Sequence, residues 1–210
     1  MKKKDSFDLG ATSLNDLLEG IAAKKPAPGG GAAAAALGAL AAALGRMVIS
    51  FTEGKEEFAD LLDPLRKSAK ALDEQRREFM SLCDKDAEAF AELSRLIRRR
   101  PDDHERMQNE GNAVRAVINV PLEGLKLTLD TAERLAWLAE RSNNHLRSDL
   151  AIGAVFAEAA GRACLWNVRI NLPMLVDQIE RSTLLAEGEG LLKQVSEKRA
   201  AVEAACLEGW

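Results

Sequence analysis

Histidine and cysteine are scarce in this chain, and their scarcity limits the chemistry available to it. Only two histidines are present, His104 and His145, and both lie in polar, loop-like surroundings. The three cysteines are odd in number and widely separated, and Cys83 and Cys164 fall within apolar series at helical spacing. These cysteines are typical of small core residues rather than of disulfides or a metal site. We expect no bound metal, because a histidine-rich centre cannot be assembled.

Blocks of positive charge are also missing. The 210 residues carry a formal charge of −4 without a basic block, which argues against nucleic acid or an anionic membrane as a partner. Residues 1–4 are positively charged, but no apolar run follows them, so they do not form a secretory signal. The uncharged run at residues 26–45 approaches membrane-spanning length, but alanine and glycine contribute little transfer free energy and Arg46 closes the run. We predict a cytoplasmic protein without a membrane span.

Strand patterns are lacking as well. No segment alternates with period two, whereas nearly every apolar series recurs at three and four residues. The pattern predicts an all-α fold, a helical bundle with long antiparallel helices, as a single domain over residues 1–210. A capping box at Ser13 and Asp16 predicts a short first helix, and Asp63 and Pro64 are the expected N-cap and first position of a long third helix. Further helices are expected over about 102–140, from about 148 to Pro173, and from 181 onward.

The stretch at residues 26–52 joins a loop that cannot be helical to a segment rich in alanine and leucine, so the junction is a helix N-terminus. The loop ends with Pro28, Gly29, Gly30 and Gly31. Glycines ahead of a helix leave several N–H groups free to bind an anion or a polar ring edge. Gly31, Gly38 and Gly45 recur every seven residues and make one face smooth. That face either packs a neighbouring helix, the commoner case for such a helix alone, or admits a flat ligand.

Asp86 interrupts the apolar stripe of the third helix. The seven-residue series to which it belongs is otherwise apolar, with Leu65, Leu72, Phe79 and Leu93. Its neighbours three and four residues away are apolar too, so Asp86 is predicted to point inward. Burial raises the pKa of a carboxyl group, and such groups are enriched at active sites. The alternative, equally weighted on periodicity alone, is a carboxylate that reaches solvent or pairs with Arg115 or Arg147.

Three further features are candidates for a site. Pro121 lies within the fourth helix, which it must kink or restart, freeing a backbone carbonyl. Asp149 begins the next helix, where a favourable first-turn charge is the commoner explanation. Side-chain amides occur at Asn143, Asn144, Asn167 and Asn171. Asn167 and Asn171 lie four residues apart, so their amides either hydrogen-bond the edge of a heterocycle or bond to a neighbouring helix. The residues alone favour the bond to a neighbouring helix.

Six segments of the chain match one known family in order and spacing. They are PAPGGGAAAAALGALAAALGRMV (26–48), FTEGKEEF (51–58), DKDAEAF (84–90), VPL (120–122), RSNNHLRSDL (141–150) and NVRINL (167–172). Over about residues 14–181 the chain resembles the formiminotransferase-cyclodeaminase C-terminal family. That family includes the cyclodeaminase domain of a bifunctional folate enzyme and stand-alone bacterial methenyltetrahydrofolate cyclohydrolases. The final helix, 182–210, lies outside the match.

The resemblance implies a helical homodimer that binds tetrahydrofolate carrying a one-carbon unit, with no cofactor beyond that substrate. It favours the functional interpretation of Asp86 as general acid/base, with Asp149 second in line. It also implies that Asn143 or Asn144, with Asn167 and Asn171, orients the pterin, while the glycine loop presents backbone donors and admits the flat ring along the smooth helix face. The family often has serine directly after the three glycines, where this chain has Ala32.

Three functions remain open at this point. The leading one is a stand-alone cyclohydrolase that converts 5,10-methenyltetrahydrofolate to 10-formyltetrahydrofolate, because no formiminotransferase domain is attached. The second is a formiminotetrahydrofolate cyclodeaminase that works with a separate transferase. The third is a non-catalytic helical dimer that binds folate, which the loss of the loop serine favours slightly.

Overall fold

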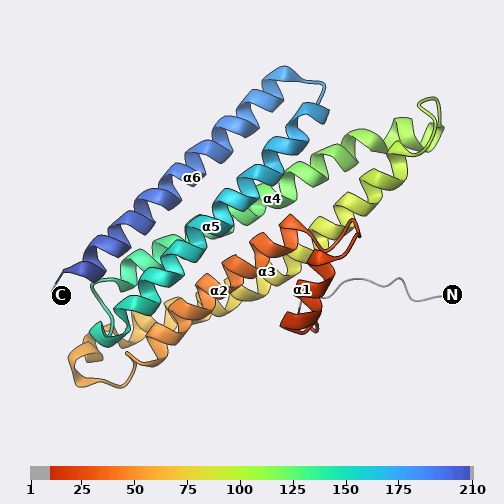
Figure 1. Ribbon diagram of the computed structural model, residues 1–210. Helices are drawn as coiled ribbons and strands as arrows, with labels where there is room; N and C mark the ends of the chain where they lie inside the picture. Colours follow the sequence, from red (N-terminus) through yellow and green to blue (C-terminus); the bar gives the residue numbers. More distant parts are fainter. Residues whose placement is uncertain (1–9, 209–210) are drawn as a thin grey trace.

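The computed structural model describes residues 10–208, and this part of the chain contains helices and no strands (Figure 1). The six α-helices are α1 (Leu14–Ala22), α2 (Gly30–Ser50), α3 (Leu62–Ile97), α4 (His104–Leu138), α5 (Arg147–Asn171) and α6 (Gln178–Leu207). Short 3₁₀ turns cover Glu56–Leu61, Asn144–Leu146 and Leu172–Met174. The predicted all-α fold is confirmed.

Helices α2 to α5 pack together as a bundle, α6 lies along α4 and α5, and α1 lies near the start of α2 (Figure 1). The bundle therefore has two ends. The start of α2, the late part of α3 and the last turns of α5 lie toward one end. The end of α2 and the loop between α4 and α5 lie at the other.

The helix starts show which capping predictions were right. Ser13 caps α1, with its hydroxyl accepting from the Asp16 N–H at 3.1 Å and donating to the Asp16 carboxylate at 2.6 Å. Asp103 likewise caps α4 by accepting from the N–H of Arg106. The predicted start of α3 at Asp63 and Pro64 was wrong, since α3 begins at Leu62 directly after the 3₁₀ turn. Because the 3₁₀ turn runs directly into α3, no capping side chain is needed at this helix start.

The seven-residue series of α2 and α3 pack against each other in antiparallel order. A Cβ atom on Gly45 would lie 3.1 Å from a Leu72 methyl group, and one on Gly38 only 2.4 Å from the Phe79 ring. The glycines thus let α3 approach closely, and core side chains cover the smooth face. The expectation that a flat ring enters along the smooth helix face does not hold at Gly38, where Phe79 already occupies the space.

Helix α2 is long and apolar enough to cross a bilayer, by length and composition alone. Half of its most apolar window is buried within the protein, and it packs against both α3 and α5. Its composition is therefore explained by its place at the centre of the helical bundle.

Candidate active site

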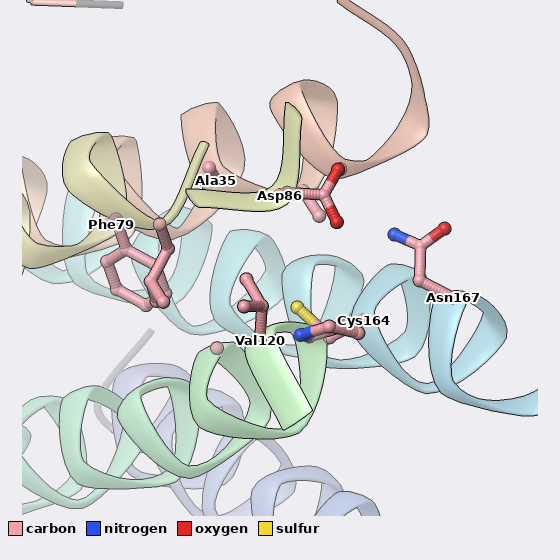
Figure 2. A pocket seen from close by; sticks show the side chains of 11 residues that line it. Ala35, Phe79, Asp86, Val120, Cys164 and Asn167 are labelled. Atoms are coloured by element: carbon pink, nitrogen blue, oxygen red, sulfur yellow. The ribbon is translucent and has the colours of Figure 1, made fainter. Parts of the chain in front are cut away.

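A small pocket opens where the first turn of α2 meets α3, α4 and α5 (Figure 2). Four residues singled out from the sequence line it: Gly31, Asp86, Pro121 and Asn167. Its volume of about 20 Å³ is enough for one water molecule. Four separate segments of the chain therefore converge on one site.

Asp86 continues the packing series of α2 and α3, but at the point where α2 begins. A Cβ atom on Gly31 would lie 2.0 Å from Oδ2 of Asp86 and 2.5 Å from its Cγ. The carboxylate thus occupies the space that any side chain at position 31 would fill. Glycine at this position is required for the observed placement of Asp86.

The surroundings of Asp86 make its charged form less favourable than it is in water. Its side chain is half-buried, and burial raises the pKa of the carboxyl group. Within residues 10–208 no cation or hydrogen-bond donor compensates for this burial. Arg115 pairs with Glu180 through two bonds of 2.8 and 2.9 Å, and Arg147 donates to the Glu208 carbonyl. The inward direction of Asp86 is confirmed, and the two proposed arginine partners are engaged elsewhere.

Asn167 faces Asp86 across the mouth of the pocket, and its amide points toward the carboxylate (Figure 2). A Cβ atom on Gly30 would lie 3.7 Å from Oδ1 of Asn167, so the first turn of α2 is close to this amide as well. The first intrahelical bond of α2 is donated by Ala33 to Gly29, which leaves the N–H groups of positions 30 to 32 without partners in the helix. The site therefore combines one carboxylate, one amide and an open helix N-terminus.

Residues 13–189 match the family model described as formiminotransferase-cyclodeaminase, which covers all of these positions. The chain belongs to the formiminotransferase-cyclodeaminase family. The match confirms the resemblance found over about residues 14–181 and extends it into α6.

Relatives in the formiminotransferase-cyclodeaminase family are both stand-alone and multidomain proteins. The methenyltetrahydrofolate cyclohydrolase of Methylorubrum extorquens is 29% identical over 189 residues, covering 88% of this chain and 91% of that protein. The formimidoyltransferase-cyclodeaminase of Mus musculus is 31% identical over 197 residues, and the aligned region covers 91% of this chain but only 36% of the mouse protein. The crystal structure of formiminotetrahydrofolate cyclodeaminase from Thermotoga maritima superimposes with a TM-score of 0.86 at 30% identity, covering 93% of this chain and 96% of that one.

Asn171, in the same family segment as Asn167, has a structural partner. Proline at position 121 has no N–H, so the carbonyl of Val117 one turn earlier lacks its helical donor. Nδ2 of Asn171 donates to that carbonyl at 3.0 Å and to the Asn167 carbonyl at 2.9 Å. The freed carbonyl predicted from the sequence is present, α4 continues through the proline without a restart, and the interhelical bond is formed.

We expect Asn171→Ala to lower the free energy of unfolding by about 1–2 kcal/mol, because the partly buried Val117 carbonyl loses its donor. Urea unfolding followed by circular dichroism measures this. Asn109→Ala is the matched control, since its amide bonds a carbonyl of its own helix at the exposed surface. A loss no larger than in the control would show that Asn171 does not stabilise α4 around Pro121.

The segment RSNNHLRSDL lies at the other end of the bundle. The N–H of Asn143 donates to Oγ1 of Thr52, its Nδ2 donates to the Phe51 carbonyl, and its Oδ1 accepts from the N–H of His145. These bonds tie the loop between α4 and α5 to the end of α2. Asn144 is exposed and Asp149 half-buried. Asp149 precedes Asn167 by 18 residues, which corresponds to about 27 Å along α5.

Some residues of the glycine loop have a structural role, and others belong to the site. Pro28 follows a cis peptide bond, and a Cβ atom on Gly20 of α1 would lie 2.9 Å from its ring, so Pro28 holds α1 against the loop. Gly29 is the N-cap of α2. Within one chain the structure therefore brings together Gly30, Gly31, Asp86 and Asn167, and it leaves Asn143, Asn144 and Asp149 apart from them.

Two pocket-lining residues were interpreted from the sequence only as core residues. Phe79 forms one wall, and the sulfur of Cys164 points into the pocket (Figure 2). Burial, with a smaller contribution from the charge of Asp86, raises the pKa of Cys164 to about 12, so this thiol stays protonated. Its spacing of three residues from Asn167 is the signal that places both on the pocket side of α5. Within residues 10–208 no group of three or more histidine, cysteine or acidic side chains is placed to hold a metal ion.

Proposed function

We propose that this protein is a cytoplasmic folate enzyme that hydrolyses 5,10-methenyltetrahydrofolate to 10-formyltetrahydrofolate. The observation that carries the proposal is the placement of Asp86, a half-buried carboxylate over Gly31 with no cation among the described residues. A substrate whose one-carbon unit is a cationic amidinium supplies the missing positive charge. The 29% identity to a cyclohydrolase along almost its full length supports this choice of substrate.

The chemistry needs one group that takes a proton and returns it. Water adds to the amidinium carbon between N5 and N10, and the Asp86 carboxylate accepts one proton from it. The neutral tetrahedral adduct then collapses: its hydroxyl releases a proton to solvent, the bond from carbon to N5 breaks, and Asp86 returns its proton to N5. The product is 10-formyltetrahydrofolate, with one proton released overall. The raised pKa of Asp86 suits both directions of transfer, because it lies closer to neutrality than that of an exposed aspartate.

The rest of the pocket supports binding and orientation. The free N–H groups of Gly30 and Gly31 and the amide of Asn167 offer donors and an acceptor to the edge of a pterin ring. The cavity itself is too small for the ring, but it has room for one water molecule beside Asp86. We therefore place the pterin at the mouth of the pocket and the attacking water inside it.

A second candidate is favoured by the superposition on a formiminotetrahydrofolate cyclodeaminase. In that reaction N10 attacks the formimino carbon on N5, and ammonia leaves from the tetrahedral carbon. Asp86 would serve again as the group that moves the proton. In this case the substrate itself supplies the nucleophile, so the pocket water has no role.

Two assays separate these functions. Loss of methenyltetrahydrofolate absorbance, corrected for spontaneous hydrolysis, measures the cyclohydrolase, and ammonia release from formiminotetrahydrofolate measures the cyclodeaminase. We expect acceleration in the first. Acceleration only in the second would assign the cyclodeaminase instead. Thermal protection by folate without turnover in either would identify a passive folate-binding protein.

We also propose a homodimer formed through α5. One stripe of α5 exposes Ile152, Val155, Trp166 and Ile170, with exposed fractions of 43–73%. A two-fold axis at the middle of this stripe places Ile152 of one copy beside Ile170 of the other. Asp149 lies one turn before Ile152 on the same face, so it approaches the Asn167 end of the second copy. The dimer would thus unite the two groups of family residues that a single chain keeps apart.

We expect Val155→Glu to convert the dimer to a monomer, because it places a charge within the apolar stripe. Size-exclusion chromatography with light scattering measures the mass, and turnover should fall at least about tenfold if the second copy completes the site. Met107→Glu, which adds the same charge at a 70% exposed position on α4, is the control and should remain dimeric. Full turnover by a monomeric Val155→Glu variant would rule out the contribution of the second copy.

A further inference from the structure

A second, larger groove of about 500 Å³ lies between the start of α3 and the last part of α4. Ser68 lines it, and this residue precedes Asp86 by 18 positions, about 27 Å along α3. The groove is therefore separate from the pocket around Asp86. Neither the proposed reaction nor the stripe on α5 uses it.

Ser68 has an unusual position for a hydroxyl group. The residue is only 5% exposed, and its Oγ has no hydrogen-bond partner among residues 10–208. Leaving a buried hydroxyl unpaired is unfavourable, and a helical serine can avoid it by bonding the carbonyl four residues earlier. A hydroxyl that lines a groove without a partner is available to a ligand.

The charged residues of the groove are unpaired as well. Arg134 has a buried Nε with no partner in the described part of the chain. No ion pair is formed there by Arg134, Lys67, Asp130 or Glu133, although all four line the groove. Elsewhere the chain pairs comparable groups, for example Arg106 with Glu110. Cations and anions thus face one space without neutralising each other directly.

We propose that this groove binds a small zwitterion of the α-amino-acid type with an apolar, flat side chain. The guanidinium of Arg134 and the hydroxyl of Ser68 suit a carboxylate, which takes two parallel bonds from arginine. Asp130, one helical turn before Arg134, suits the ammonium group. The Trp137 ring lines the same groove and supplies a surface for the side chain. A purely anionic ligand would be repelled by the negative charges of Asp130 and Glu133. We therefore assign a positive and a negative group to the same ligand.

Titration with L-phenylalanine, followed by calorimetry and by tryptophan fluorescence, tests the proposal. We expect saturable binding in the micromolar to millimolar range, with a fluorescence change that disappears in Trp137→Phe. Arg134→Gln should weaken binding at least tenfold. Arg98→Gln is the matched control, since it removes an exposed arginine at the other end of α3 and should bind as the wild type does.

Two further probes test each charge. N-acetylphenylalanine lacks the ammonium group and phenethylamine lacks the carboxylate, so both should bind at least tenfold more weakly than phenylalanine. Ser68→Ala should weaken phenylalanine binding several-fold without lowering the melting temperature of the free protein, because the hydroxyl has no partner there. Absence of saturable phenylalanine binding, equal binding of the N-acetyl compound, or unchanged binding in Arg134→Gln would each overturn the proposal.

Discussion

Asp86→Asn should lower turnover by at least about a hundredfold, because asparagine cannot take a proton from the attacking water. The same change should raise the melting temperature at neutral pH. Burial raises the pKa of Asp86, so the folded protein holds this proton more tightly than the unfolded chain does. The stability that this bound proton provides is fully present below the pKa of Asp86 in the unfolded chain. It is lost as the pH rises through the higher pKa of Asp86 in the folded protein. The neutral amide avoids that loss.

The pH dependence makes this prediction specific. The stability advantage of Asp86→Asn should be present at neutral pH and should close as pH falls below the ordinary pKa of aspartate. Thermal unfolding of both proteins across this range, beside steady-state turnover, measures the two effects. Glu88→Gln is the control, because Glu88 is an exposed acid two residues away on the same helix. Near wild-type turnover in Asp86→Asn would remove this carboxylate from the mechanism.

Gly31→Ala should reduce turnover by a similar factor, of order a hundredfold, through displacement of Asp86. The added methyl group would lie 2.0 Å from Oδ2 and must push the carboxylate away from its position. In an unobstructed helix the change from glycine to alanine stabilises by roughly 0.5–1 kcal/mol. Gly190→Ala on α6, where no atom lies within 4 Å of the new methyl group, should show that gain. Gly31→Ala should not.

A double variant separates this clash from a general effect on α2. Adding Asp86→Ala removes the side chain that the new methyl group meets, so the double variant should recover the stabilisation seen in Gly190→Ala. Its turnover should stay as low as that of Asp86→Ala. Additive stability effects of the two changes, measured by urea unfolding, would show that Gly31 and Asp86 are not in contact.

Much of the fold could be predicted because its main signals are local. The seven-residue series of glycines in α2 and of large residues in α3 were both visible in the sequence, and the structure packs one against the other. Asp86 was identified because it is the polar exception in such a series. Pro121 likewise predicted a free carbonyl, since the missing N–H follows directly from the residue type.

The composition of the site could not be derived in the same way. Periodicity shows which residues share one face of a helix. It does not show which other helix packs on that face, or where along the bundle axis the contact lies. For this reason Asn143 and Asp149 could not be separated from Asn167 before the fold was known. Asn143 lies in the loop before α5, tied to the end of α2, and α5 holds Asp149 and Asn167 at opposite ends. The donor that satisfies the Val117 carbonyl comes from 54 residues away, and the asparagine pair predicted an interhelical bond without identifying its partner.

We propose that the cluster of Asp86, Gly31 and Asn167 turns over methenyltetrahydrofolate. The most direct measurement is the decay of methenyl absorbance at catalytic concentrations of the folded wild-type protein, with the spontaneous rate subtracted. Our account predicts a decay rate that rises linearly with protein concentration and yields 10-formyltetrahydrofolate over many turnovers. A rate indistinguishable from that in buffer, for protein shown to be helical and folded, would contradict it.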